Sequence, residues 1–202
     1  ILITASGPSL SSSLKNIKKY RENFFLIAVS SSLSVLLYNK IFPDLVISTD
    51  GGFWAKKHLE LNGEDLKKLK STVFALTDEA NCPKDILQNQ KILPLAYPSS
   101  IGEKIFTDSK IEFLPALRNG TVSGTAAAFA LRLTQKNVYF CGLDLAENSG
   151  FQHAQPNMLE KNSQNKDFRL ETKEKRQVSS RFNSKGSLGI YRSWFKNQGK
   201  SF

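Results

Sequence analysis

Cysteine is almost absent from this sequence. Cys82 and Cys141 are the only two among 202 residues, too few for the disulfide framework of a small secreted domain. Cys141 stands inside an apolar run, where a thiol is typical of a core residue. This scarcity favours a reducing compartment, and we expect a cytoplasmic protein.

Other hallmarks are missing too. No apolar run reaches the length of a membrane span, and no signal-peptide pattern opens the chain. We find no internal repeat, coiled coil or low-complexity tract. An RNA-binding motif and an aromatic-rich basic strand are also absent, so nucleic acid is not the expected partner.

The composition is that of one globular domain. Hydrophobic residues make up 40% of the chain and charged residues 23%, which is typical of a soluble protein with a core of its own. A net charge of +10 favours an anionic partner such as a nucleotide, nucleic acid or acidic glycan, and charge alone does not choose among them. The chain begins at Ile1, inside an expected strand and without Met, which suggests a fragment of a longer protein.

Short apolar runs alternate with helical segments along most of the chain. Strands are expected at 1–5, 24–29, 45–48, 72–76, 92–95 and 138–143. Helices are expected at 10–20, at 33–40, at 53–70 with a break near Asn62-Gly63, after Pro83, and from about Ser123. This rhythm is typical of parallel βαβ units. It predicts an α/β, Rossmann-like domain whose central sheet is mostly parallel and has helices on both faces.

Two stretches fit the rhythm less well. Pro94 inside its strand indicates a sheet edge or a strand end, and 97–117 is expected to be loop with a short connecting element. In 157–186 apolar residues are sparse and eight Lys or Arg stand against four Asp or Glu, which predicts a mobile loop or a basic lid. An amphipathic helix at 188–196 should dock back on the domain.

The segment from Arg118 to Thr125 is the strongest candidate for a ligand site. It is small and polar, and it leads into a helix whose expected apolar face carries Val122, Ala126, Phe129 and Leu133. Unpaired N–H groups and the helix dipole at such a start suit a phosphate. In this interpretation Ser123 caps the helix or meets phosphate, and Gly124 leaves the first turn open. An ordinary capped turn is the alternative.

Three further turns follow expected strands, on the edge where open α/β sheets bind ligands. Ser6-Gly7-Pro8-Ser9 is neither a GxGxxG fingerprint nor a P-loop, although Gly7 would let a ligand approach the backbone. Asp50-Gly51-Gly52 offers a carboxylate for ribose hydroxyls or a metal, and Asp144 directly follows the last strand. Each is also compatible with a simple turn or a surface carboxylate.

Four blocks together resemble one family. They are Gly7-Pro8-Ser9-Leu10, Pro43 to Asp50, Ser123-Gly124-Thr125-Ala126, and Gly142 to Ala146 with His153-Ala154. In order and spacing they resemble the Maf (motility-associated factor) proteins, flagellin glycosyltransferases, and the MptE-like archaeal 6-hydroxymethylpterin diphosphokinases of the same domain family. The Gly-Pro-Ser-Leu and Ser-Gly…Gly-Leu-Asp elements are also similar to bacterial sialyltransferases that use CMP-sugars.

The resemblance implies a Rossmann-like sheet over the whole chain, 1–202, and a nucleotide-bound donor. It implies catalytic roles for His153 and Asp144, although sialyltransferases carry their catalytic His in a different local context. The residues implied in nucleotide binding are Gly7, Pro8, Ser9, Asp50, Asn119, Gly120, Thr121, Ser123, Gly124 and Thr125.

Two reactions follow from the resemblance, and a binding module without chemistry is a third possibility. The favoured reaction transfers a nonulosonic or sialic-acid-like sugar from a CMP-linked donor to a hydroxyl of a glycan or protein acceptor, and requires no metal or other cofactor. The alternative transfers diphosphate from ATP to a pterin with Mg²⁺, for which Asp50 and Asp144 would be the ligands.

Overall fold

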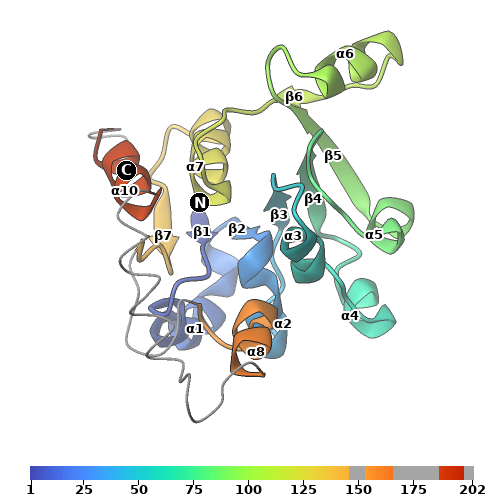
Figure 1. Ribbon diagram of the computed structural model, residues 1–202. Helices are drawn as coiled ribbons and strands as arrows, with labels where there is room; N and C mark the ends of the chain where they lie inside the picture. Colours follow the sequence, from blue (N-terminus) through green and yellow to red (C-terminus); the bar gives the residue numbers. More distant parts are fainter. Residues whose placement is uncertain (146–152, 166–186, 198–202) are drawn as a thin grey trace.

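The computed structural model describes residues 1–145, 153–165 and 187–197. Within these ranges seven parallel strands form one sheet in the order β6-β5-β4-β3-β2-β1-β7 (Figure 1). The strands are β1 Leu2–Thr4, β2 Leu26–Val29, β3 Leu45–Ser48, β4 Val73–Thr77, β5 Lys91–Ala96, β6 Leu114–Pro115 and β7 Tyr139–Cys141. The expected α/β, Rossmann-like architecture is confirmed, and its sheet is wholly parallel.

Helices cover both faces of this sheet. The α-helices are α1 Leu10–Lys19, α2 Leu33–Tyr38, α3 Phe53–His58, α4 Gly63–Lys68, α5 Lys84–Asn89, α6 Ile101–Asp108, α7 Val122–Leu133, α8 Met158–Gln164 and α10 Ser187–Asn197, with 3₁₀ turns at Arg21–Asn23 and Ser30–Ser32. The expected break between α3 and α4 is confirmed at Asn62, whose side chain caps α4.

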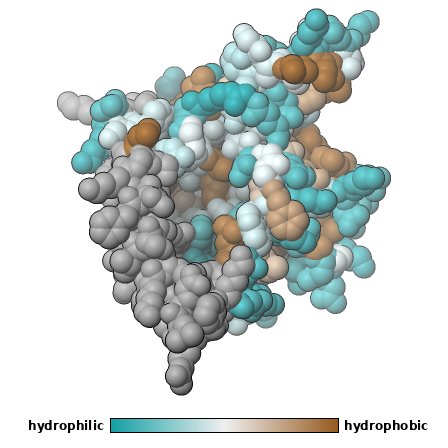
Figure 2. All heavy atoms as spheres, viewed as in Figure 1, coloured by the Kyte–Doolittle hydropathy of each residue, from teal (hydrophilic) through white to brown (hydrophobic). Residues whose placement is uncertain are grey.

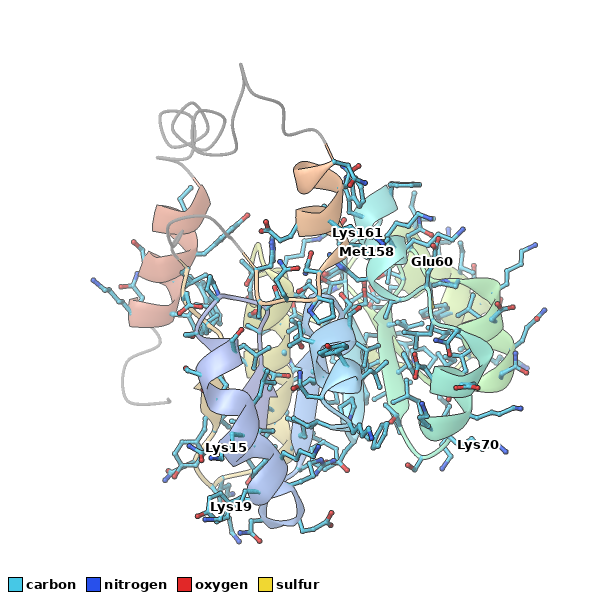
Figure 3. All side chains as sticks on the ribbon, turned by 90° about the horizontal axis from the view of Figure 1, so that it is seen from below. Lys15, Lys19, Glu60, Lys70, Met158 and Lys161 are labelled. Carbon is cyan, nitrogen blue, oxygen red and sulfur yellow. The ribbon has the colours of Figure 1, made fainter. Side chains whose placement is uncertain are left out.

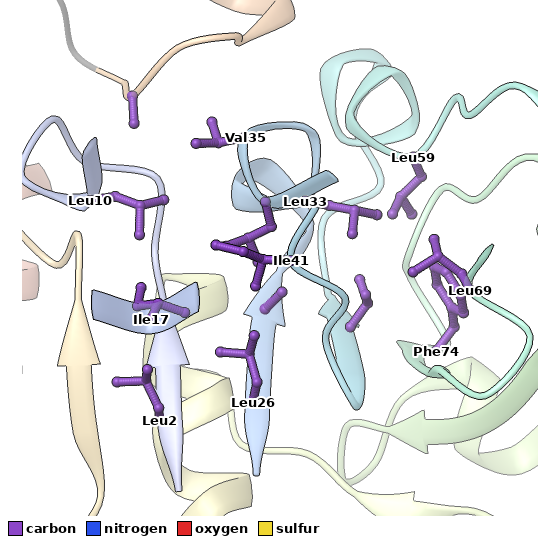
Figure 4. Close-up of a cluster of buried hydrophobic side chains, with 14 of the residues drawn as sticks. Leu2, Leu10, Ile17, Leu26, Leu33, Val35, Ile41, Leu59, Leu69 and Phe74 are labelled. Atoms are coloured by element: carbon purple, nitrogen blue, oxygen red, sulfur yellow. The ribbon is translucent and has the colours of Figure 1, made fainter. Parts of the chain in front are cut away.

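Alternate strand residues enter two separate cores, as a parallel sheet with two covered faces requires. On one face Leu26, Val46 and Phe74 pack with Leu10, Ile17 and Leu36 of α1 and α2 (Figure 4). On the other face Ile3, Ile27 and Ile47 pack with Ala126, Ala127 and Ala130 of α7. The small alanine side chains let α7 lie close against the middle of the sheet.

The direction of winding reverses at β1. From β1 the chain winds through β2 to β6, and α7 then returns it along the second face to β7, on the other side of β1. Such a reversal leaves a crevice at the carboxyl ends of the two strands, here β1 and β7. The turns that follow β1 and β7 therefore meet.

Several expectations about the elements need correction. The 138–143 strand, an apolar run typical of a buried strand, is not buried: among the described strands β7 pairs with β1 alone, and Tyr139 is 60% exposed. Leu133 is also exposed, at the end of α7. Between 97 and 117 the expected short connecting element is helix α6, and the two-residue strand β6 was not expected. Because β6 pairs only with Leu95 and Ala96, β5 is a sheet edge as far as Pro94, as expected.

The C-terminal part was only partly anticipated. The basic segment 157–186 begins with helix α8, so its start is not a loop, and residues 166–186 lie outside the described part. Docking of α10 is confirmed, because Trp194 and Phe195 pack on the second core. The Phe195 ring lies edge-on to the Phe140 ring, with 5.7 Å between the ring centroids. None of the helices described is long and apolar enough to cross a membrane.

An apolar surface lies at the β6 end of the sheet. Ile101 and Ile105 of α6 are 81% and 54% exposed, and brown atoms mark the position of α6 in Figure 2. Lysine side chains lie at separate places on the surface, Lys15 and Lys19 on α1 and Lys70 on the opposite side of the view in Figure 3.

Candidate functional site

Helix α7 begins one residue before the expected Ser123, and its cap is Thr121. The Thr121 Oγ1 accepts a hydrogen bond from the Gly124 N–H at 2.9 Å. The expectation that Ser123 caps the helix was therefore wrong. Thr121 has the extended backbone of an N-cap, and Ser123 already lies inside the first turn.

Gly124 packs tightly instead of leaving the first turn open. It is buried, and a Cβ added there would lie 2.6 Å from the Asn119 Cβ. Glycine thus lets the 118–121 loop fold back onto α7. The N–H groups of Val122 and Ser123 have no hydrogen-bond partner within the described residues, so the start of α7 still offers two donors to an anion.

Gly120 shapes the same loop by another route. Its φ of +74° is a conformation that side chains other than glycine rarely adopt. A Cβ there would also lie 2.7 Å from the ring of Tyr191 in α10. The loop is therefore held between α7 and α10.

This loop forms one wall of a cavity of about 370 Å³ at the carboxyl edge of the sheet. The opposite wall comes from the turns after β3, β4 and β5. The lining residues are Thr49, Asp50, Glu79, Tyr97, Arg118, Asn119, Gly120, Thr121, Val122 and Thr125. The volume lies within the range of small-molecule sites.

Arg118 is fixed across this cavity by two contacts. Its guanidinium forms a two-pronged ion pair with Glu79 and lies over the Tyr97 ring, 4.2 Å from the centroid. The hydrogen bond and charge of Glu79 raise the pKa of Arg118 above its usual value. A planar cation held in this way can stack on a flat ligand or pair with phosphate.

Asn119 brings a donor to the same cavity. Its side-chain Nδ2 is buried and has no hydrogen-bond partner in the part of the chain that the structure describes. Such an amide N–H is costly to leave unpaired, so a ligand acceptor at this position would be bound favourably. Asp50 is exposed beside it, and its Oδ1 accepts from the Gly52 N–H at 2.8 Å.

The first turn and Asp144 form a second cluster at the β1/β7 crevice. The Gly7 N–H donates to the Gly142 carbonyl, and the Ser9 N–H donates to the Asp144 Oδ2 at 3.0 Å. A Cβ at Gly7 would collide with the Asp144 carboxylate, so glycine permits the close approach. The Asp144 carboxylate therefore occupies the position beside the start of α1 where the helix dipole favours a negative charge.

His153 lies over the same edge. The Ala154 N–H donates to the Ser6 carbonyl at 2.8 Å, which places this segment on the β1 turn. The Asn157 side chain donates to the Ser31 carbonyl after β2. His153 itself is half-buried and contacts Glu160 of α8, with 3.2 Å between Nδ1 and Oε1.

A second histidine, His58, lies close by at the end of α3. It is only 7% exposed, and burial lowers its pKa to about 4, with help from the charge of nearby His153 and against that of Asp50. Helix α8 packs on α3 (Figure 3, near Met158, Lys161 and Glu60). His58, His153 and Asp50 therefore share one neighbourhood.

The structure thus divides the expected site residues into two groups. Asp50, Asn119, Gly120, Thr121 and Thr125 line the cavity, whereas Gly7, Pro8, Ser9 and Asp144 form the crevice cluster. Ser123 and Gly124 belong to α7 behind the cavity wall. Among the described side chains, no three His, Cys, Asp or Glu are arranged to hold a metal ion.

Four residues near these groups were missed as site candidates. Glu79 could have been predicted from the sequence, because it follows strand β4 much as Asp50 follows β3. Tyr97 follows β5 in the same way. His58 and Glu160 occupy helical segments, and only the packing of α8 on α3 brings them to the site.

Comparison with known proteins supports this architecture. The family model for 6-hydroxymethylpterin diphosphokinase MptE-like proteins matches residues 1–150, about three quarters of the chain. Two uncharacterized proteins of Treponema pallidum (strain Nichols) are similar to it. One is 37% identical over 131 residues, which cover 65% of this chain and 28% of the relative. The other is 26% identical over 161 residues, which cover 76% of this chain and 26% of the relative. The chain spans little more than a quarter of the length of these relatives.

A solved structure shares the fold. The structure of MAf glycosyltransferase from Magnetospirillum magneticum AMB-1 matches 74% of this chain and 24% of its own, with a TM-score of 0.59 and 21% sequence identity. At this identity the likeness shows that the two chains have the same fold.

Proposed function

The chain belongs to the 6-hydroxymethylpterin diphosphokinase MptE-like family, and we propose that it is a glycosyltransferase with a nucleotide-linked donor. The donor would be a CMP-linked nonulosonic or sialic-acid-like sugar, and the acceptor a hydroxyl of a glycan or protein. The fold shared with a protein described as a glycosyltransferase supports the transferase class.

The observation that carries the proposal is the cavity between the 118–121 loop and the turns after β3 to β5. It combines a flat cation, Arg118, with the buried amide donor of Asn119 and the N–H groups at the start of α7, which have no partners among the described residues. A nucleotide has a flat base and an anionic phosphate, so these groups match its two ends.

In glycosyl transfer from a CMP-sugar, negative charge grows on the leaving phosphate. Preorganised donors lower the barrier because they are already oriented toward that charge. The N–H groups of Val122 and Ser123 would serve in this way, with Arg118 as the nearby cation. His153 would take the acceptor proton as general base.

The diphosphokinase alternative has one specific observation in its favour. The cavity lining carries two carboxylates, Asp50 and Glu79, against one guanidinium, Arg118. A lining of net negative charge suits Mg²⁺ bound with the phosphates of ATP. Asp50 would then act with Glu79.

Joint metal binding by Asp50 and Asp144 does not suit the sheet order. Asp50 follows β3 and Asp144 follows β7, and β2 and β1 lie between these strands. Three strand spacings amount to roughly 14 Å, too far for two carboxylates to share one ion. This separation supports the glycosyltransferase reaction over the alternative in its expected form.

A thermal-shift panel tests the proposal. CMP, a CMP-linked sugar, ATP and a pterin are each added with and without Mg²⁺. A ligand at about a hundred times its Kd stabilises the folded state by about 2.7 kcal/mol, roughly 5–11 °C in Tm for a chain of this size. We expect such a shift with CMP and the CMP-sugar in the absence of metal.

The other outcomes of the panel oppose the proposal. A shift seen only with ATP and Mg²⁺ would favour the diphosphokinase. No shift with any ligand would favour a binding module without this chemistry.

A further inference from the structure

Glu160 and His153 contact each other twice. The Glu160 Oε1 accepts the His153 backbone N–H at 3.1 Å and lies 3.2 Å from the His153 Nδ1. Glu160 is only 4% exposed. A carboxylate this deeply buried requires partners, and the histidine supplies two of them through one oxygen.

The surrounding contacts fix the position of this pair. The Asn157 Oδ1 accepts from the Leu159 N–H at the start of α8, and its Nδ2 donates to the Ser31 carbonyl. The Ala154 N–H donates to the Ser6 carbonyl. The backbone around His153 is thus attached to the turns after β1 and β2, while Glu160 is carried by a helix that packs on α3.

Among the described residues, only one ring nitrogen of His153 has a partner. Its Nδ1 faces Glu160, and its Nε2 has no hydrogen-bond partner within the described residues. A carboxylate at Nδ1 holds the proton of a neutral imidazole there, which leaves the Nε2 lone pair free to accept a proton. The groups around the ring are Glu160 of α8, His58 of α3 and, beyond His58, Asp50 after β3.

We propose that Glu160 is a positioning residue that holds His153 in its Nδ1–H tautomer, with Nε2 directed to the acceptor hydroxyl. This inference rests on the proposed function. In the transfer step the acceptor oxygen bonds to the anomeric carbon of the sugar and its proton passes to Nε2. The bond from that carbon to the phosphate oxygen breaks, and CMP leaves with the electron pair.

Buried His58 supports this arrangement. Burial keeps His58 neutral over the physiological range. A neutral neighbour does not oppose the positive charge that His153 acquires when it accepts the proton. The carboxylate of Glu160 stabilises that charge directly.

The first test is independent of catalysis. Nitrogen-detected NMR of the histidine rings at neutral pH distinguishes Nδ1–H from Nε2–H. We expect the Nδ1–H form at His153 in the parent protein and a mixture of tautomers in Glu160→Gln, whose neutral amide no longer selects one form. A matched control is Glu60→Gln, because Glu60 is exposed, lies just after α3 and pairs with Lys57 at the surface. This control should leave the His153 signals unchanged.

The second test uses turnover of the CMP-sugar. Glu160→Gln should lower kcat at least about tenfold, part of the effect expected for a general base, while KM for the donor stays within about twofold. Because the two residues act as a unit, adding Glu160→Gln to His153→Ala should cause no further loss. Circular dichroism and the melting curve check that each variant is folded.

The results separate this inference from the proposed function. An Nε2–H tautomer in the parent, or an unchanged tautomer in folded Glu160→Gln, overturns the role of Glu160 whatever the enzyme does. If the tautomer changes as expected but the parent shows no turnover with a CMP-sugar, the pairing stands and the proposed reaction is wrong. Losses that add in the double variant also overturn the positioning role.

Discussion

Arg118 shows how one side chain can serve both the fold and a ligand. Its fork pairs with Glu79 and its flat face covers Tyr97, so the cation is oriented although it is largely exposed. Lysine carries the same charge but offers neither the planar fork nor the stacking surface. We therefore expect ligand binding in the cavity to depend on the planar geometry of the guanidinium more than on its charge.

We therefore predict that Arg118→Lys weakens nucleotide binding at least about tenfold, the loss expected for one charge-assisted contact. Isothermal titration with CMP measures the change, and the Tm should stay near that of the parent because the residue is exposed. The matched control is Arg132→Lys, because Arg132 is exposed in the last turn of α7 and outside the cavity lining. Equal losses in both variants, or none in Arg118→Lys, would contradict the role.

At the scale of the element, the start of α7 was predictable in place but not in detail. Apolar spacing located the helix to within one residue, and small polar residues marked its first turn as a site. Which hydroxyl caps it could not be read from the sequence, because Thr121 and Ser123 are both good N-caps. The choice depends on how the 118–121 loop folds back on Gly124, which is a tertiary contact.

That contact gives a prediction for Gly124→Ala. The new methyl group would lie 2.6 Å from the Asn119 Cβ, so the loop must shift and Asn119 should lose its place in the cavity. We expect CMP binding to fall at least about tenfold, and the Tm to fall as well. A larger side chain, as in Gly124→Val, would disturb packing and binding together.

The control for this variant is Gly63→Ala. Gly63 opens α4, and a Cβ there has nothing within 4 Å. Alanine is the better helix former by about 1 kcal/mol, so the Tm should be unchanged or slightly raised and CMP binding unaffected. Parent-like binding and Tm in Gly124→Ala would mean that the loop tolerates the shift.

At the scale of the whole molecule, the sheet was predictable because its strands carry their own signals. Runs such as Leu45–Ser48 are apolar up to their last residue and buried throughout, as strands covered on both faces are, and each is followed by a small-residue turn. Strand order is a different matter, because it depends on pairing between distant residues. The edge position of β7, and with it the exposure of Tyr139, follows from that order.

The candidate site was only half predictable for the same reason. Residues directly after a strand, such as Asp50, could be assigned to the ligand edge from the rhythm alone. Their division into a cavity and a β1/β7 cluster required the strand order. His58 lies within a helix and becomes part of the site only because α8, about a hundred residues later, packs on α3.

The burial of His58 couples the stability of the whole fold to pH. In the folded protein its pKa is about 4, whereas in the unfolded chain it should be near 6.5. Between these values the unfolded chain binds a proton that the folded protein does not, so stability is complete above about pH 6.5 and falls as pH drops toward 4. At about 1.4 kcal/mol per pKa unit the loss is at most about 3 kcal/mol.

We predict that His58→Gln removes this part of the pH dependence. Urea unfolding of both proteins at intervals from pH 7 to pH 4 gives the free energy of unfolding. The other ionisable groups are the same in both proteins, so their effect largely cancels in the difference. The free energy of unfolding of the parent, relative to that of the variant, should decrease as the pH falls through this range, because only the parent has a histidine that stays uncharged in the folded state. If the difference in the free energy of unfolding stayed constant from pH 7 to pH 4, His58 would accept a proton in the folded protein at no cost in stability. The interpretation of His58 as a neutral buried histidine beside His153 would then be wrong.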